Sequence, residues 1–536
     1  MDFRYAIIYG CSLNLAKPLI MKKVKSKTIT TIISLIITLA VISAILFSFL
    51  PPPNRTPGSQ EPTQIAQTPT TNPLTPEIVQ MLAQGEQASQ QQDYQAAVET
   101  YSDIIEKMPD YPLLYDKRAQ AFQALGDYTS ALKDISSLLE ISGETGDLLR
   151  QRGDLNLLNE DYTEAVRDYT RAIELNPGDM DALNNRGIAY IRSDQADKAL
   201  QDLDLVVRTS PERIDALLNR ALVYEATDRL EEALDDYSTA IHLSAENTAS
   251  VFARRGILYA RMEMEGQALT DLNKAIEQGY EDVSVFNMRA LIYSSMGQVQ
   301  DALADFNKAI TLNPDNPSVY INRGNLHIST KEYALAVQDY QNAIRLDPQN
   351  IMYTNNLGIA YYLREDYASA ITTYDRAIEM DPEYAPAYQN RANAYAQNEQ
   401  PELALEDYTR VIELQPDSAD AYYNRGILYY QLKKYDLALE DFNRIIEQEM
   451  GNIVQALNMR AVIYTMQNRY TPALDDLTQA IIIDPEFARS YNRRALIYKS
   501  LGKTPQAIED LRQYLELETD PNLRKDAEDL LKSLGG

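Results

Sequence analysis

The chain repeats itself every 34 residues, and this period constrains the fold more than any other feature of the sequence. Residues 422–446, YYNRGILYYQLKKYDLALEDFNRII, are matched 34 residues upstream by YQNRANAYAQNEQPELALEDYTRVI. Such a period indicates stacked supersecondary units, because one unit alone cannot bury its apolar face. Thirteen copies span residues 78–521 and begin at residues 78, 112, 146, 180, 214, 249, 283, 317, 351, 385, 419, 454 and 488.

The residue types within one copy predict two helices that pack against each other. Position 20 is alanine and position 8 is glycine or alanine in all thirteen copies, so two backbones can approach closely there. Large apolar or aromatic residues recur at positions 4, 11, 17 and 24, the spacing of two facing amphipathic helices. Proline at position 32 in eight copies ends the second helix.

This frame of small, aromatic, alanine, aromatic and proline positions resembles the tetratricopeptide repeat. The resemblance implies a right-handed superhelix of antiparallel helix pairs whose concave face binds peptides or protein partners. We therefore expect an all-α solenoid of thirteen helix pairs over residues 78–521 and a capping helix over 522–536. One transmembrane helix is expected to precede the array.

Two charged positions vary together. Position 7 is arginine in eleven copies and position 23 is aspartate in eleven copies, and copies 1 and 9 lack both. Copy 9 has Leu357 and Thr373 instead. The coincidence predicts a structural ion pair between the two helices of the same copy, in a geometry that can be bidentate. In copies 8, 10 and 11 the predicted pairs are Arg323 with Asp339, Arg391 with Asp407, and Arg425 with Asp441.

Asparagine, a poor residue for a helix interior, fills position 6 in six copies. The family resemblance places this position on the concave face, where an amide can donate to and accept from a peptide backbone. The alternative is that duplication copied these residues without a ligand. The candidate partner-binding residues, all in copies 8–11, are Asn322, Asn356, Asn390, Asn424, Tyr362, Tyr423 and Tyr430.

Charge and composition restrict the function. The chain has a net charge of −28, and residues 1–77 are basic, so the rest is strongly acidic and repels nucleic acid. We expect protein or extended peptide partners, including basic segments, and no small-molecule substrate. One cysteine and two histidines give no basis for a metal site, a cofactor or catalysis, so the chain is expected not to be an enzyme.

The N-terminal segments predict a membrane anchor. Residues 1–27 are short and basic, and residues 28–50 form an uncharged apolar stretch that is long enough to span a bilayer. The basic side chains place the N-terminus in the cytoplasm and the array outside it, in a periplasm or at the cell surface. Residues 51–77, rich in proline and threonine, are expected to be a disordered linker.

Two alternatives stay open at this stage. The apolar stretch is either an uncleaved signal anchor or a cleaved signal that yields a secreted protein, and translation starts at either Met1 or Met21. The repeats form either a peptide-binding scaffold or a structural factor of an envelope complex, which would use its convex face or its ends.

Overall fold

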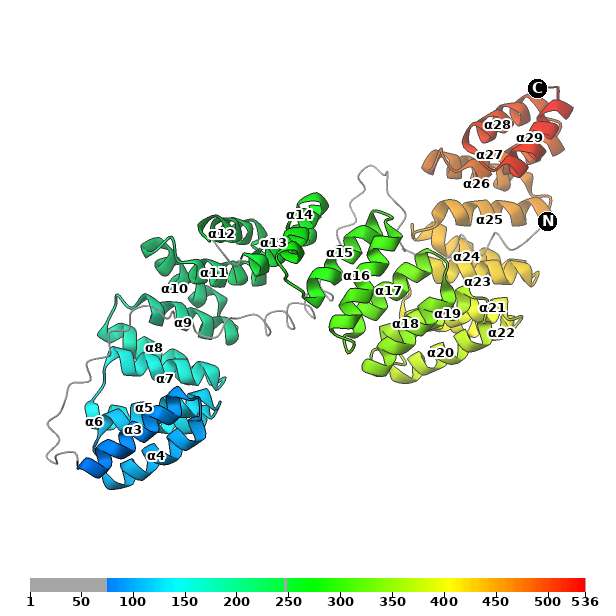
Figure 1. Cartoon of the computed structure of the whole chain (residues 1–536). Coiled ribbons are helices and arrows are strands. Elements are labelled where there is room, and N and C mark those ends of the chain that lie inside the picture. Colours follow the sequence, from blue (N-terminus) through cyan, green and yellow to red (C-terminus); the bar gives the residue numbers. More distant parts are fainter. Residues whose placement is uncertain (1–74, 245–247, 536) are drawn as a thin grey trace. The chain divides into compact units, whose positions relative to one another are not determined.

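The computed structural model describes residues 75–244 and 248–535, which form twenty-seven α-helices and no strand (Figure 1). The prediction of an all-α repeat array is confirmed. Within the described ranges, no helix is both long and apolar enough to cross a membrane. The predicted anchor at 28–50, the basic segment 1–27 and nearly all of the linker 51–77 lie outside them.

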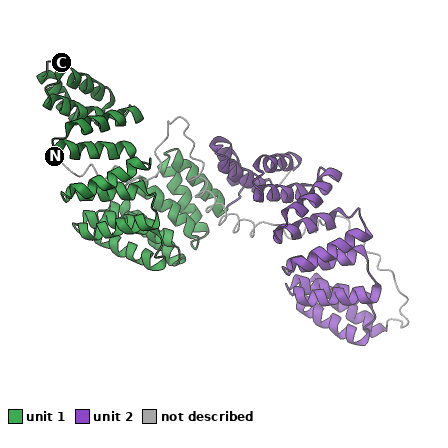
Figure 2. Cartoon of the chain, turned by 180° about the vertical axis from the view of Figure 1, so that it is seen from behind, with its two compact units in different colours: residues 1–20, 282–536 green, residues 21–281 purple. Residues whose placement is uncertain are grey.

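The helices fall into two compact units, which Figure 2 shows in different colours, and each is considered by itself. In chain order, the first unit, which Figure 2 labels unit 2 and draws in purple, ends at residue 281 and holds copies 1–6. Its helices are α3 (Pro76–Gln90), α4 (Tyr94–Lys107), α5 (Pro112–Ala124), α6 (Tyr128–Ser142), α7 (Gly146–Leu158), α8 (Tyr162–Leu175), α9 (Met180–Arg192), α10 (Ala196–Thr209), α11 (Ile214–Ala226), α12 (Leu230–Leu243), α13 (Ala249–Arg261) and α14 (Glu265–Glu277).

The second unit, from residue 282, holds copies 7–13 and one further helix at the end of the chain. Its helices are α15 (Val283–Ser295), α16 (Val299–Leu312), α17 (Pro317–Ser329), α18 (Tyr333–Leu346), α19 (Ile351–Leu363), α20 (Tyr367–Met380), α21 (Ala385–Gln397), α22 (Pro401–Leu414), α23 (Ala419–Gln431), α24 (Tyr435–Glu447), α25 (Ile453–Met466), α26 (Tyr470–Ile483), α27 (Ala488–Ser500), α28 (Thr504–Leu517) and α29 (Pro521–Ser533).

Each copy is an antiparallel helix pair, and within each unit every pair stacks on the next. The first helices of neighbouring copies also contact each other, for example α19 with α21 and α25 with α27. The second helices of neighbouring copies are less closely packed against each other. The first helices therefore lie on the inner side of each stack. The handedness of the stack stays a prediction.

Small residues allow the two helices of a copy to approach. A Cβ atom on Gly153 would lie 2.7 Å from Cε1 of the Tyr169 ring, and one on Gly324 would lie 2.7 Å from Cε1 of Tyr340. These pairs are positions 8 and 24 of their copies. The alanine at position 20 is fully buried, as Ala404 is. Close packing therefore explains why positions 8 and 20 hold small residues in every copy.

The turn between the two helices has the same backbone conformation in every copy. Position 15 is left-handed in all thirteen, with φ between 57° and 78°. Only three of these residues are glycine, the residue that adopts this conformation without steric cost. The left-handed residues are Gln92, Gly126, Glu160, Asp194, Asp228, Glu263, Gly297, Lys331, Glu365, Glu399, Lys433, Asn468 and Gly502.

Replacing Glu399 by glycine is therefore expected to stabilise the chain. Glu399 is exposed and has φ 58°, so the change relieves steric strain at the cost of some unfolded-state entropy. We expect a gain of about 0.5–1 kcal/mol in the free energy of unfolding, measured by urea denaturation. The matched control is Glu440→Gly inside α24, which should lose about 1 kcal/mol. A loss in both variants would contradict the proposed strain.

Candidate protein-binding site

Every arginine at position 7 pairs with the aspartate at position 23 of its own copy. This pairing was predicted from copies 1 and 9, which lack both residues. In copy 10, Nε of Arg391 donates to Oδ2 of Asp407 at 2.8 Å and Nη2 donates to Oδ1 at 2.7 Å. Asp407 is 5% exposed, so this bidentate pair is largely shielded from water. The other ten pairs have the same two bonds.

The same guanidinium also joins neighbouring copies. Nη1 of Arg391 donates to Oδ1 of Asp375, at position 25 of the preceding copy, at 2.6 Å. Arg425 makes the equivalent bond to Thr409 at 2.9 Å. The Arg391 guanidinium carbon also lies 5.5 and 5.6 Å from the ring centres of Tyr388 and Tyr395, within cation–π range. One side chain thus connects both helices of its copy, two core rings and the preceding copy.

Copy 9 replaces this arrangement with a different set of contacts. Leu357 is buried, and the Thr373 hydroxyl donates to the carbonyl oxygen of Ser369 in its own helix at 2.7 Å. The link to the preceding copy comes instead from Gln341, whose Nε2 donates to the Tyr361 hydroxyl at 3.0 Å. Copy 9 is therefore joined to copy 8 by a neutral bond where other copies use a charged one.

The asparagines at position 6 take part in a second set of bonds between copies, which was not predicted from the sequence. Nδ2 of Asn390 donates to Oδ1 of Asn355, at position 5 of the preceding copy, at 3.0 Å. Asn322 donates to Asn287 in the same way at 3.0 Å. In the first unit, Asn219 donates to Asn184 at 3.0 Å, and both are buried. These amides have a structural role on the inner side of the stack.

Two of the four candidate asparagines are different. Across the part of the chain that the structure describes, Asn356 and Asn424 make no side-chain hydrogen bond and are partly exposed. The residue at position 5 before Asn356 is Ile321, which offers no acceptor. The residue at position 5 before Asn424 is Gln389, whose Oε1 is buried and has no hydrogen-bond donor. Copies 9–11 therefore present unused amide groups on the inner helices.

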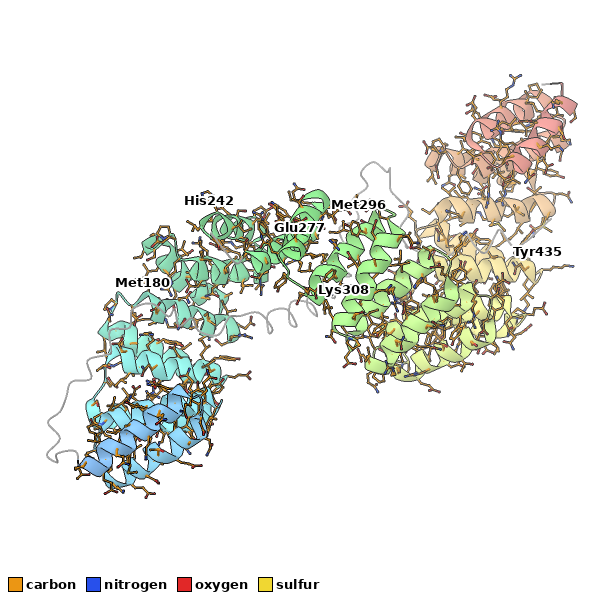
Figure 3. The ribbon with its side chains drawn as sticks, in the orientation of Figure 1. Met180, His242, Glu277, Met296, Lys308 and Tyr435 are labelled. Carbon is orange, nitrogen blue, oxygen red and sulfur yellow. The ribbon has the colours of Figure 1, made fainter. Side chains whose placement is uncertain are left out.

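The three candidate tyrosines are partly buried and each ring packs against another ring. The centroid of Tyr362 lies 5.6 Å from that of Tyr367, and Tyr423 lies 6.0 Å from Phe442. Tyr430 lies 5.9 Å from Tyr435, which Figure 3 labels at the start of α24. Burial raises the pKa of Tyr423. The rings are therefore held in place by their own copies while part of each remains accessible.

Two arginines of the last copy act electrostatically on Tyr423 and were not among the predicted site residues. Arg489 and Arg493 stand at positions 2 and 6 of α27, and their positive charges act on the Tyr423 phenol. The Arg493 guanidinium donates to Oδ1 of Asn458 at 3.3 Å. Two arginines on one face of an inner helix were the available signal in the sequence.

The described residues contain no group of histidine, cysteine, aspartate and glutamate side chains that could hold a metal ion. His327, at position 11 of copy 8, is buried, and its Nδ1 lies 2.8 Å from Oε2 of Glu332. It occupies the place that tyrosine fills in neighbouring copies, which is a packing position.

The ion pair can be tested by comparison with copy 9, which lacks it. Arg391→Leu leaves Asp407 buried without a counter-ion, and we expect it to cost about 3–5 kcal/mol in the free energy of unfolding. The double variant Arg391→Leu/Asp407→Thr reproduces the residues of copy 9 and should cost less than the single variant. Urea denaturation measures both, and hydrogen exchange locates the change to α21 and α22. A double variant less stable than Arg391→Leu would contradict the pairing.

Comparisons with known proteins agree with this architecture. Family models described as tetratricopeptide repeat match residues 117–179, 186–248, 321–385 and 390–453, residues 168–201 and 373–406, and residues 488–521, and one described as TPR repeat matches 290–331. Together they cover more than half of the chain. A search of curated proteins finds no match.

Two solved structures resemble the chain over most of its length. The crystal structure of the APC/C hetero-tetramer Cut9–Hcn1 is 16% identical, with a TM-score of 0.36, over 86% of this chain and 96% of that one. Yeast Tom70 is 18% identical, with a TM-score of 0.34, over 85% of this chain and 95% of that one. The repeat geometry and the family matches show that the chain belongs to the tetratricopeptide repeat family.

Proposed function

We propose that this protein is a non-enzymatic scaffold that binds protein segments on the inner helices of copies 8–11, α17, α19, α21 and α23. The observation that carries this proposal is the buried Oε1 of Gln389, which has no donor within the described chain. Buried acceptors in folded proteins almost always have a partner, and leaving one unpaired costs free energy. Because Oε1 is buried, the Gln389 side chain has to turn toward the surface, where a peptide N–H of a bound segment supplies the missing donor.

The neighbouring amides support the same surface. In three other copies the amide at position 6 donates to the amide at position 5 of the preceding copy, as Asn390 does to Asn355, and in a fourth Asn185 donates to Asp154. Asn424 and Gln389 occupy these two positions but do not form the bond, and Asn356 has no amide opposite it. Each free amide offers one donor group and one acceptor, the pair of functions that an extended backbone requires. Inheritance by duplication explains the bonded asparagines but supplies no role for the unbonded ones.

The partly exposed tyrosines supply the apolar component of the surface. Tyr362, Tyr423 and Tyr430 come from α19 and α23, on either side of α21, and each is fixed by an aromatic neighbour. Rings that are already ordered lose little conformational entropy when a partner packs on them. Tyrosine is also enriched at the residues that dominate binding energy in protein interfaces.

We also propose that residues 28–50 tether the scaffold to a membrane, with the N-terminus in the cytoplasm and the repeats outside. The support is the uncharged apolar stretch and the basic residues before it. Residues 51–77 would then set the distance between the membrane and the repeats. The secreted form, produced by cleavage after the apolar stretch, is the alternative.

A second candidate function uses the outer surface. Ile482 and Ile483, at the end of α26, are 75% and 48% exposed, which is unusual for neighbouring large apolar residues. A structural partner in an envelope complex could cover them. Because Ile482 and Ile483 lie outside the inner helices, variants at these two residues and variants on the inner helices separate the two candidate functions.

The binding surface is tested with the full chain in detergent. Asn356→Ala/Asn424→Ala is expected to lose the partner that the wild type captures from its own cell extract, with an unchanged melting temperature. Gln389→Leu is expected to lose the same partner while the free chain becomes about 1 kcal/mol more stable, because an unpaired buried acceptor is removed. Capture is quantified by mass spectrometry and stability by urea denaturation.

Two control variants show whether the inner or the outer surface captures the partner. Asn322→Ala removes an amide that already donates to Asn287, so it should lower stability more than capture. Ile482→Asp changes only the outer surface and should leave capture intact. If Ile482→Asp abolishes capture and the amide variants retain it, the outer surface is the functional one.

The membrane tether is tested by alkaline extraction of cell membranes. The wild type should stay with the membrane, and Ile36→Lys/Ile42→Lys should be released, because lysine in the centre of a span costs about 2.5–3.5 kcal/mol per residue. Lysines placed in the linker instead, at Thr63 and Thr68, should change nothing. A mature N-terminus beyond residue 50 would instead support the secreted form.

A further inference from the structure

The turns between the two helices of copies 11–13 carry positive charge in a chain whose net charge is −28. Together with the end of α27 they form a row that we call the basic edge. Its residues are Lys433, Lys434, Arg469, Lys499 and Lys503. All five are exposed, and within the described part of the chain none forms an ion pair with a carboxylate. Asp436 is the only acidic residue within two positions of these turns.

Position 16 shows that this charge is unfavourable for the fold. It is the N-cap of the second helix, and in copies 1, 2, 3 and 9 an aspartate there caps the helix. Oδ1 of Asp366, for example, accepts from the backbone N–H of Ser369 at 3.2 Å. Copies 11–13 have Lys434, Arg469 and Lys503 at this position, and these side chains make no capping bond. A cation at this end of a helix also opposes the helix dipole.

Copy 5 shows how the fold neutralises a cation at position 16. Nη2 of Arg229 lies 2.9 Å from Oε1 of Glu232, which stands three residues later in the first turn of α12. The equivalent residues of copies 11–13 are Leu437, Pro472 and Gln506, and none of them is a carboxylate. The three cations are therefore a cost that stacking does not require.

The opposite edge of the same stack has the opposite charge. Residues 381–384, 415–418, 448–452, 484–487 and 518–520, which connect each copy to the next element, contain no lysine or arginine. Their acidic residues are Asp381, Glu383, Asp417, Glu449, Asp484, Glu486, Glu518 and Asp520. A negatively charged surface attracts one edge and repels the other, so charge alone orients these copies with the basic edge toward that surface.

Exposed apolar side chains lie beside the basic edge. Met466 and Leu501, at positions 13 and 14 of copies 12 and 13, are 53% and 39% exposed. The Tyr430 hydroxyl of copy 11 donates to the Met466 sulfur at 3.6 Å, so neighbouring copies meet at this edge. Basic and exposed apolar side chains on one surface are the combination that binds anionic lipid, because cations reach the phosphates while apolar atoms enter the acyl boundary.

We infer that the basic edge of copies 11–13 binds an anionic membrane surface, with Met466 and Leu501 at the boundary of the acyl chains. The inference does not depend on the inner-helix surface. The cations stand on the ends of three successive helix pairs, a row that a flat layer of lipid phosphates can contact at once. Contact with lipid gives a role both to the uncapped cations and to the exposed apolar residues, whereas an acidic protein segment accounts only for the cations.

The test measures whether the copy 12 turn touches lipid. The full chain with Cys11→Ser and Gln467→Cys is labelled with a fluorescent dye and reconstituted into vesicles that contain nitroxide-labelled lipid. Gln467 is exposed and follows α25. We expect quenching in vesicles of mixed phosphatidylglycerol and phosphatidylcholine, and a loss of quenching in high salt or in phosphatidylcholine alone. A dye on Thr227→Cys, the equivalent exposed position of copy 5, should respond equally to both lipid mixtures.

Charge reversal at position 16 separates binding from folding. Lys434→Asp/Arg469→Asp/Lys503→Asp gives three helices the N-cap residue of copies 1, 2, 3 and 9, so the urea midpoint of unfolding should rise. The ratio of docked to free chain, obtained from the quenching, should fall at least about a hundredfold. The control Arg345→Glu/Arg376→Glu/Arg444→Glu changes the net charge equally at exposed sites of second helices and should keep the docking of the wild type.

Three outcomes would overturn the inference. The first is equal quenching with and without phosphatidylglycerol, and the second is docking that survives charge reversal at position 16 or is lost equally in the control. The third is a dye that ignores lipid while the position-16 variant loses an acidic protein captured by the wild type, which would make the basic edge a protein-binding site. None of these outcomes changes capture through Asn356 and Asn424, so the scaffold proposal stands or fails separately.

Discussion

The arrangement of the repeats depends on one side chain, the arginine at position 7. Its planar guanidinium has enough donors to serve three helices: Nε and Nη2 bond the aspartate of the second helix, and Nη1 bonds the preceding copy, as Arg391 does with Asp407 and Asp375. Lysine could not do this, because its ammonium group lacks the fixed fork of donors. A solenoid has few long-range contacts, so a residue that spans copies affects the coupling of the whole stack.

Much of this arrangement could be predicted from the sequence, because each position of the repeat can be compared across thirteen copies. Arginine and aspartate disappear together in copy 9, and that coincidence identifies the pair without any coordinates. The left-handed turn at position 15 could not be predicted as easily, since most copies have residues such as Glu399 or Lys433 rather than glycine. The surrounding helices impose that conformation, and a sequence pattern does not record an imposed strain.

The candidate site was predicted only in part, for a related reason. The asparagine row is visible in the sequence, but three of its bonds join position 6 of one copy to position 5 of the copy before. Asn390 and Asn355 are 35 residues apart, one more than the period, so an alignment of copies places them in different columns. The sequence therefore treats Asn390 and Asn424 as equivalent, whereas only the structure distinguishes the bonded amide from the unbonded one. Arg493 was missed because no second copy repeats it with the same neighbours.

These observations give a general reason to look for function where a repeat departs from its own pattern. A contact repeated in most copies is explained by stacking, and selection for stability is sufficient to maintain it. The unpaired buried Oε1 of Gln389 is a cost that stacking does not require, because most copies avoid it. Among the described residues, Oε1 of Gln151 in copy 3 is the other glutamine oxygen of this kind. Gln389 lies on an inner helix, at position 5 of the copy that precedes Asn424. A bound segment that donates to Gln389 would remove this cost, so the departure agrees with the binding surface proposed for copies 8–11.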